Sequence, residues 1–247
     1  MTTTTLSTWL SRVTVTATSS LQTLVLKRLK FTGLSDRARE LRKLTSLPYE
    51  LHQAVIGMLL SDAGCYRTKG PTSNSRLEWS FGQHRADLAQ FIYDLLKDYV
   101  QTPVTTLFTR PTTESEPILS HRLKTLALPV FNFYRELFYK LNPATGKYVK
   151  IVPLNIEELL TPIALAFIIM GDGNYKDGAV RIYTNGFTHE DNLRLAAAMQ
   201  QVFGIKVRVK HDRKNQYILV INSSELQQLQ QIVLPHMHSS MLYRIGL

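Results

Sequence analysis

The segment LAFIIMGDG (residues 165–173) is an apolar run that ends in an acidic residue and a glycine. An earlier segment, VIGMLLSDAG (residues 55–64), has the same form. Their acidic residues, Asp62 and Asp172, stand 110 residues apart in a chain of 247. This repeat predicts that the chain holds two copies of one structural unit.

Both segments have the pattern of a buried helix. In the first copy the apolar residues recur at helical spacing, and further apolar residues widen the stripe until it covers nearly the whole helix. The residues that set this spacing are Leu51, Ala54, Val55, Met58 and Leu59. The second copy begins with Thr161-Pro162, a hydroxyl at the N-cap and a proline at the first helical position. We expect Gly173 to end that helix with a positive φ angle.

The two aspartates lie where a helix carries partial negative charge, so a carboxylate is electrostatically unfavourable there. A pair of such residues suggests that a positive group, most simply a divalent cation, lies between them. Carboxylate oxygens and helix-end carbonyls suit Mg²⁺. The alternative is that Asp62 and Asp172 only cap the turns that follow their helices.

The paired segments resemble the LAGLIDADG motif of homing endonucleases, and the layout is similar to that of single-chain, two-motif enzymes encoded in organellar introns. The resemblance runs from about residue 48 to the C-terminus. Phe167 stands at the glycine position of the second copy, and Leu60 and Met170 replace the first aspartate of the motif. The last aspartate, which carries the chemistry in the family, is kept as Asp62 and Asp172.

The expected fold class is α+β, with two pseudo-symmetric helix-strand-strand-helix-strand-strand-helix units that form a DNA-binding saddle over a central helix pair. We expect a basic extension at 1–46, a first unit at 47–142, a linker at 143–155 and a second unit at 156–247. The expected strands are 65–69, 76–81, 104–109, 121–126, 178–187, 205–210 and 217–221. The expected later helices are 88–100, 131–141, 190–203 and one capped by Ser224.

Small residues predict close packing of the two motif helices. Gly57 and Ser61 are four residues apart and therefore lie on one helix face. We expect Phe167 to fill the room left at Gly57, which would bring both aspartates to the same end of the helix pair.

Composition narrows the class of protein. Cys65 is the only cysteine, which excludes an internal disulfide and argues against a zinc finger. The longest apolar run, residues 163–170, is too short to cross a bilayer, so no membrane partner is expected. A net charge of +10 suggests a polyanionic partner. We expect a monomer with internal pseudo-twofold symmetry.

The charge is concentrated near the N-terminus. Residues 1–46 hold eight Lys/Arg and two acidic residues, a net of +6, which leaves +4 for the remainder. Residues 1–35 have no acidic residue and many Ser and Thr, which is typical of a mitochondrial or plastid transit peptide. The alternative is a basic tail that orders on RNA or DNA. We expect a mitochondrial protein, with the chloroplast as the alternative.

Rows of polar side chains on the expected strands suit a duplex, because cations neutralise phosphates while Asn, Gln and Arg read base edges. An ordinary solvated sheet face would show the same alternation. The candidate nucleic-acid-binding residues are Arg76, Glu78, Arg122, Lys124, Arg181, Tyr183, Asn185, Lys206, Arg208, Lys210, Arg213 and Lys214.

The resemblance implies catalytic roles for four residues. Asp62 and Asp172 would hold Mg²⁺ for phosphodiester hydrolysis. The family often places a basic residue beside each active site, and the candidates here are Lys150 and Arg244, each of which could instead be a surface cation. Arg244 departs from the lysine often found in relatives, and arginine is a poor proton carrier, so one strand would be cut more slowly.

The leading hypothesis is a site-specific double-strand DNA endonuclease. An alternative is an RNA-binding maturase, or an endonuclease-derived scaffold in an organellar ribonucleoprotein such as the mitochondrial ribosome, bound to intron or ribosomal RNA. The basic extension favours this alternative, whereas the retained aspartate pair favours the enzyme. A DNA-binding regulator without cleavage would not explain both acids.

Overall fold

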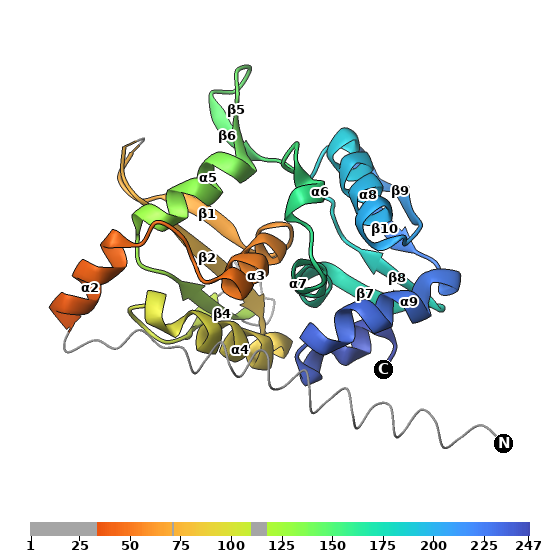
Figure 1. Cartoon of the computed structure of the whole chain (residues 1–247), viewed down its shortest axis with the longest axis horizontal. Coiled ribbons are helices and arrows are strands. Elements are labelled where there is room, and N and C mark those ends of the chain that lie inside the picture. The colour runs from red at the N-terminus through yellow and green to blue at the C-terminus, as the bar shows by residue number, and fades with distance from the viewer. Residues whose placement is uncertain (1–33, 71, 110–117) are drawn as a thin grey trace.

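Two apolar helices, α3 (Tyr49–Leu59) and α7 (Pro162–Asp172), pack against each other at the centre of the molecule (Figure 1). The computed structural model describes residues 34–70, 72–109 and 118–247. From Ala164 to Gly171 every residue of α7 is buried, which the uninterrupted apolar run requires. The expected N-cap is confirmed, since the Thr161 hydroxyl accepts from the Ala164 backbone N–H at 3.2 Å.

Small residues allow the two helices to approach closely. A Cβ atom on Gly57 would lie 2.2 Å from the Ala164 carbonyl oxygen and 2.7 Å from the Phe167 Cβ atom. One on Gly171 would lie 2.4 Å from Ser61 Oγ. The expectation that Phe167 packs at Gly57 is confirmed, and no side chain fits at either glycine without separating the helices.

The first unit follows the expected order. After α3 come β1 (Gly64–Arg67), β2 (Ser75–Gly82), α4 (Ala86–Leu96), β3 (Thr105–Thr109), β4 (Ile118–Lys124) and α5 (Asn132–Phe138). The four strands form one antiparallel sheet in the order β1-β2-β4-β3. Leu77, Trp79 and Phe81 of β2 are buried, as their alternation predicts.

The second unit repeats this topology. After α7 come β7 (Gly173–Lys176), β8 (Ala179–Ile182), α8 (His189–Phe203), β9 (Val207–Arg213), β10 (Gln216–Ile221) and α9 (Ser223–Val233). Its sheet has the order β7-β8-β10-β9, which is the order of the first sheet when β7, β8, β9 and β10 are matched with β1, β2, β3 and β4. The predicted α+β repeat is therefore confirmed, and it includes β7, which sequence analysis did not place.

Two regions hold structure that composition did not predict. Within the expected linker, β6 (Lys147–Lys150) pairs with β5 (Tyr139–Asn142), so the helix expected to reach residue 141 ends at Phe138. A short helix, α6 (Ile156–Leu159), then leads into α7. In the N-terminal extension, α2 (Leu34–Lys43) packs beside η3 (Pro129–Phe131). The transit-peptide prediction falls on residues 1–35, and residues 1–33 lie outside the described part.

Three local expectations were wrong. Gly173 has φ −75°, because β7 begins there and the backbone leaves α7 in extended form. Asn222 rather than Ser224 is the N-cap of α9. Strand β8 ends at Ile182, so Tyr183 and Asn185 do not continue its alternation; the Tyr183 N–H donates to the Asp172 carbonyl oxygen at 2.9 Å.

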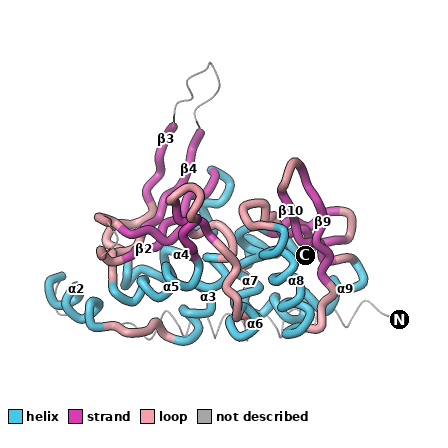
Figure 2. The backbone as a smooth tube through the Cα atoms, turned by 90° about the horizontal axis from the view of Figure 1, so that it is seen from above, coloured by secondary structure: helices cyan, strands magenta, loops and turns pink. Residues whose placement is uncertain are grey.

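Both sheets rise on the same side of the helices (Figure 2). Strands β3 and β4 of one sheet and β9 and β10 of the other stand apart on that side, while α2, α3 and α6 lie along the opposite edge. None of the helices in the described ranges has the length and apolar character that a bilayer crossing requires.

Candidate active site

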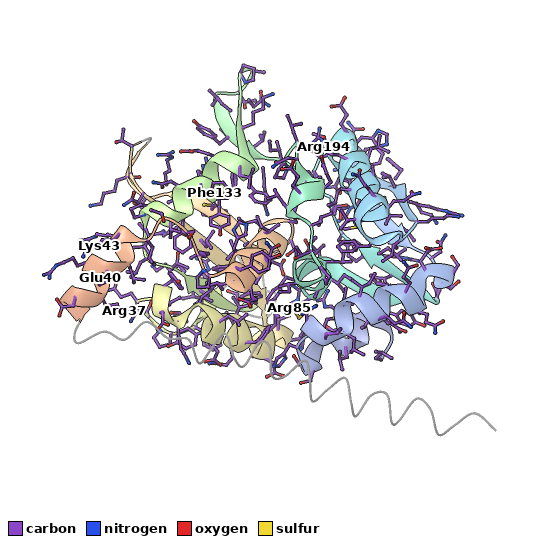
Figure 3. All side chains as sticks on the ribbon, viewed as in Figure 1. Arg37, Glu40, Lys43, Arg85, Phe133 and Arg194 are labelled. Carbon is purple, nitrogen blue, oxygen red and sulfur yellow. The ribbon has the colours of Figure 1, made fainter. Side chains whose placement is uncertain are left out.

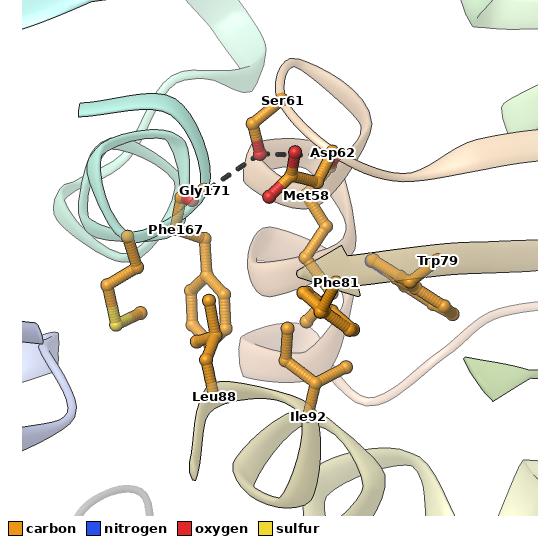
Figure 4. Close-up of a pocket in the computed structure, with 10 residues that line it drawn as sticks. Met58, Ser61, Asp62, Trp79, Phe81, Leu88, Ile92, Phe167 and Gly171 are labelled. Carbon is orange, nitrogen blue, oxygen red and sulfur yellow. Dashed lines mark hydrogen bonds between the residues drawn. The ribbon is translucent and has the colours of Figure 1, made fainter. Parts of the chain in front are cut away.

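The two motif aspartates lie at neighbouring helix ends. Asp62 belongs to the turn that follows α3, and Asp172 is the last residue of α7. A Cβ atom on Gly171 would lie 3.6 Å from the Asp62 backbone nitrogen, so the two chain segments are in contact here. The Ser61 hydroxyl donates to the Gly57 carbonyl oxygen at 3.0 Å. It also lies 3.5 Å from the Phe167 carbonyl oxygen, across the helix pair (Figure 4).

A cation from a later element binds the backbone beside each aspartate. Lys150 Nζ, at the end of β6, donates to the carbonyl oxygens of Ser61 at 2.9 Å and Ala63 at 2.8 Å. Arg244 Nη1, in η5 (Ser239–Ile245), donates to the Gly173 carbonyl oxygen. Ala63 and Gly173 follow the two aspartates directly, so Lys150 and Arg244 have equivalent places in the two units.

Burial separates these two cations from ordinary surface residues. Arg244 is 6% exposed, and its Nε atom has no hydrogen-bond partner among the described residues. Burial lowers the pKa of Lys150 to about 8, although the charges of Asp172 and Asp62 oppose that shift. Burial, together with the nearby charge of Arg85, also lowers the pKa of Arg244. Arg244 is therefore not a surface cation, and Lys150 is partly buried.

A third cation, Arg85, was not found from the sequence. It stands between β2 and α4, and its Nη1 donates to Asp62 Oδ2 at 2.5 Å. Both side chains are partly buried. Arg85 follows two other polar residues at the start of a helix, a pattern shared by many surface turns, so no sequence signal distinguished it.

Without a bound cation, the ionised forms of the two aspartates are electrostatically unfavourable. Burial raises the pKa of Asp172 to about 7, and the negative charge of Asp62 adds to that shift. Burial also raises the pKa of Asp62, while Arg85 is the largest of the charges that oppose the increase. The three cations thus offset only part of the cost of two buried carboxylates.

The interior beside Asp62 has almost no free space. The cavity there has a volume of about 10 Å³, which holds at most one water molecule. Met58, Phe167 and the side chains of β2 and α4 close it from the helix side (Figure 4). The interior behind Asp62 therefore leaves no room for a substrate group.

The candidate DNA-binding residues of the first unit share one sheet face. In the register of β2 with β4, Glu78 stands opposite Lys124 and Ser80 opposite Arg122, so these side chains point to the same side. Arg76 lies on that side too and forms an ion pair with Glu78. Their buried neighbours point to the other side, which gives this sheet a polar outer face.

The candidates of the second unit come together in part. Arg181 of β8 and Arg208 of β9 both pair with Val220 of β10, so their side chains lie on the same face of the sheet. Lys210, two residues after Arg208 on β9, lies on that face too. Tyr183 follows β8, and Asn185 donates to Asp212 at 2.8 Å. The remaining candidates lie at the ends of β9 or just outside it: Lys206, Arg213 and Lys214.

The sequence of the whole region matches one known family. Residues 52–229 match the LAGLIDADG DNA endonuclease family. The chain belongs to this family. The match covers most of the chain, including both motif helices and both sheets, and it confirms the resemblance on which the catalytic roles were based.

Similar proteins carry names of two kinds. The cytochrome b mRNA maturase bI2 of Debaryomyces hansenii is 28% identical over 203 residues, which cover 81% of this chain and 75% of that protein. The intron-encoded endonuclease ai4 of Dictyostelium discoideum is 33% identical over 119 residues, 47% of this LAGLIDADG protein and 71% of that relative. Among solved structures, the homing endonuclease I-WcaI bound to its DNA recognition sequence superposes with a TM-score of 0.75 at 19% identity, covering 90% of this chain and 96% of that one.

Proposed function

We propose that this LAGLIDADG protein is a site-specific double-strand DNA endonuclease that requires a divalent cation, with Mg²⁺ as the physiological ion. The observation that carries the proposal is the meeting of Asp62 and Asp172 at the ends of α3 and α7, each beside a cation that binds the adjoining backbone, partly buried Lys150 and buried Arg244. Family membership supports the reaction class.

The two aspartates are suited to a cation site that is completed by oxygen atoms of the substrate. Asp172, whose pKa is raised to about 7 by burial and by Asp62, forms no ion pair among the described residues, so a positive ion would relieve that cost. The described residues contain no group of three or more His, Cys, Asp or Glu side chains that could bind metal. Mg²⁺ is commonly held by one or two carboxylates together with substrate phosphates.

When bound, the cation would activate water and neutralise charge on the phosphate that is cut. Asp62 and Asp172 would hold it. Lys150 keeps the Asp62 turn in place through two carbonyl oxygens, and its pKa of about 8 leaves it mostly protonated at neutral pH. Arg244 fixes the backbone after Asp172 and contributes a permanent positive charge.

The two polar sheet faces would bind the duplex. Arg122 and Lys124 on the first sheet and Arg181, Arg208 and Lys210 on the second are placed to contact phosphates or base edges. The sheets stand on the same side of the helix pair, which would seat one duplex across both units and allow a single chain to act as a monomer (Figure 2).

The test is cleavage of a randomised duplex library in the presence of Mg²⁺, followed by sequencing of the ends. We expect cut sites to be enriched for one sequence. Asp62→Asn and Asp172→Asn should each lower double-strand cleavage at least about 100-fold while duplex binding is kept, because each carboxylate contributes several kcal/mol of charge stabilisation. Cleavage retained by both variants would refute the assigned roles.

RNA binding is the second candidate function. It is favoured by the relative named as an mRNA maturase, which covers 81% of this chain, and by the net charge of +6 on residues 1–46. We infer a mitochondrial location because residues 1–35 have the composition of a transit peptide. Sequencing of RNA that copurifies with the native protein tests the first point, and imaging of the full chain with a C-terminal fluorescent tag tests the second.

A further inference from the structure

An aromatic pocket lies at the end of α3 remote from the aspartates. It has a volume of about 350 Å³ and is lined by residues of the segment before α3, of α3 itself, and of η3 and α5. His52, in the first turn of α3, stands seven residues before Leu59, the last residue of that helix, which corresponds to roughly 10 Å along its axis, and Asp62 lies in the turn beyond. The pocket therefore lies at the other end of the central helix from the candidate active site.

Four rings form this aromatic pocket: Tyr49, His52, Phe133 and Tyr134. Tyr134 is fully buried at its base, and its hydroxyl is hydrogen-bonded to His52 Nδ1 at 2.7 Å. Phe133 packs edge-on against Tyr134, with ring centroids 5.3 Å apart. Burial lowers the pKa of His52, so the base of the pocket is uncharged at neutral pH.

Two of the four rings are largely exposed to solvent. Tyr49 is 67% exposed and Phe133 is 51% exposed, although both line the same pocket. Large aromatic rings left accessible around a pocket of this volume are typical of a binding site. The hydroxyls of Thr45 and Ser46 at the pocket supply hydrogen-bonding groups next to the rings.

The surroundings are basic. Helix α2 ends two residues before the pocket with Arg42 and Lys43, both exposed. Figure 3 shows Lys43 on α2 and Phe133 on α5, two helices that both pack against η3. Acidic residues are also present, since Glu40 pairs with Lys43 at 2.7 Å and Glu50 follows Tyr49. Over the whole of α2 four cations outnumber two acids, but Arg37 donates to the carbonyl oxygens of residues 97, 98 and 100, and Arg39 pairs with Asp36. Arg42 is exposed and forms no ion pair among the described residues, so it is the cation that would attract a negatively charged backbone here.

We propose that the aromatic pocket receives an unpaired base of single-stranded RNA, with the sugar-phosphate backbone running past the end of α2. Bases in a duplex are stacked on one another and cannot enter such a pocket, whereas unpaired RNA bases stack on aromatic side chains next to cations. The 2′-hydroxyl of RNA has the chemistry to bond with Thr45 or Ser46. This proposal rests on the RNA-binding candidate function and assigns it a site.

The test uses the full chain and a short unstructured RNA that carries one 2-aminopurine, whose fluorescence falls when it stacks. Tyr49→Ala and Phe133→Ala should each weaken RNA binding about tenfold and abolish the quenching, because one base-aromatic stack contributes that much. Tyr49→Phe keeps the ring and should bind as the unaltered protein does. Tyr49 is the more exposed ring, so Tyr49→Ala should keep the thermal stability of the fold and carries the test if Phe133→Ala, which loses the contact with Tyr134, lowers Tm.

The matched control is Phe108→Ala on β3, which removes an equally large ring that is 74% exposed on the sheet side. It should leave RNA affinity and quenching unchanged. RNA binding with unaltered quenching in both pocket variants would overturn the pocket while leaving an RNA function intact. Equal affinity for DNA of the same sequence would overturn the assignment to RNA, and no RNA binding at all would reject the candidate function itself.

Discussion

Arg85 forms an ion pair with Asp62, whereas Asp172 has no ion-pair partner among the described residues. The Arg85 Nη1 atom lies 2.5 Å from Asp62 Oδ2, and both side chains are partly buried. By topology the corresponding position in the second unit is Thr188, which instead caps α8 by accepting from the Asp191 N–H. The two halves of the candidate active site are therefore unequal in charge.

Replacement of Arg85 tests whether this guanidinium competes with a metal ion for Asp62. Arg85→Gln should increase the affinity of the DNA-free protein for Mn²⁺ about tenfold, because it removes a positive charge that contacts one carboxylate oxygen. Electron paramagnetic resonance of unbound Mn²⁺ measures this. The control is Arg76→Gln, which breaks a different arginine-acid pair on the outer face of β2. An affinity that is unchanged or lower in Arg85→Gln would show that the pair does not oppose metal binding.

Asp172 makes the stability of the metal-free protein depend on pH. Its pKa is about 7 in the folded chain, above the ordinary value of 3.8, so between these values the folded state binds more protons than the unfolded state. Stability should therefore fall as pH rises from about 4 to about 7. Asp172→Asn should remove this decrease and raise Tm at pH 7.5 by roughly 2–4 °C for each 1 kcal/mol regained. A Tm below that of the unaltered protein would show that Asp172 stabilises the fold.

The outer face of the second sheet can be tested by salt dependence. Arg208→Ala and Lys210→Ala should each weaken duplex binding and reduce the slope of log K against log salt by about 1, because each cation that contacts a phosphate releases counterions. Fluorescence anisotropy at several salt concentrations gives the slope. Lys43→Ala, on α2 at the opposite edge, should leave the slope unchanged (Figure 2). Equal effects from all three would mean that the charge acts without a defined surface.

Gly57 tests the packing that brings the aspartates together. Gly57→Ala should lower the free energy of unfolding by about 1–3 kcal/mol or more, because the added Cβ would meet the backbone of α7 at 2.2 Å. It should also lower cleavage, since Asp62 and Asp172 would be separated. Gly82→Ala is the control, with no atom within 4 Å of the added Cβ. Denaturant unfolding followed by circular dichroism measures the stability of both variants. Equal stabilities would contradict the close-packing argument.

Much of the architecture follows from local pattern. The alternation in β2 and the 3.6-residue spacing in α3 each reflect one buried face, which any short window of sequence contains. The same is true of the repeat that placed Asp62 and Asp172. Errors occurred where one residue type is compatible with two backbone conformations. A glycine can end a helix with a positive φ angle, but Gly173 ends α7 in extended form and begins β7.

Sequence alone determined that two apolar helices would carry paired carboxylates, since their residues and spacing are local properties. The family resemblance named Lys150 and Arg244 as candidate cations, but only the tertiary structure decided what they bind, and it added Arg85. Lys150 reaches a turn 87 and 89 residues earlier in the chain, Arg244 reaches back 71 residues, and Arg85 closes on Asp62 from the start of a different helix. The aromatic pocket likewise joins Tyr134 to His52 across 82 residues. Such contacts depend on how separate elements pack, and no periodicity within one element encodes them.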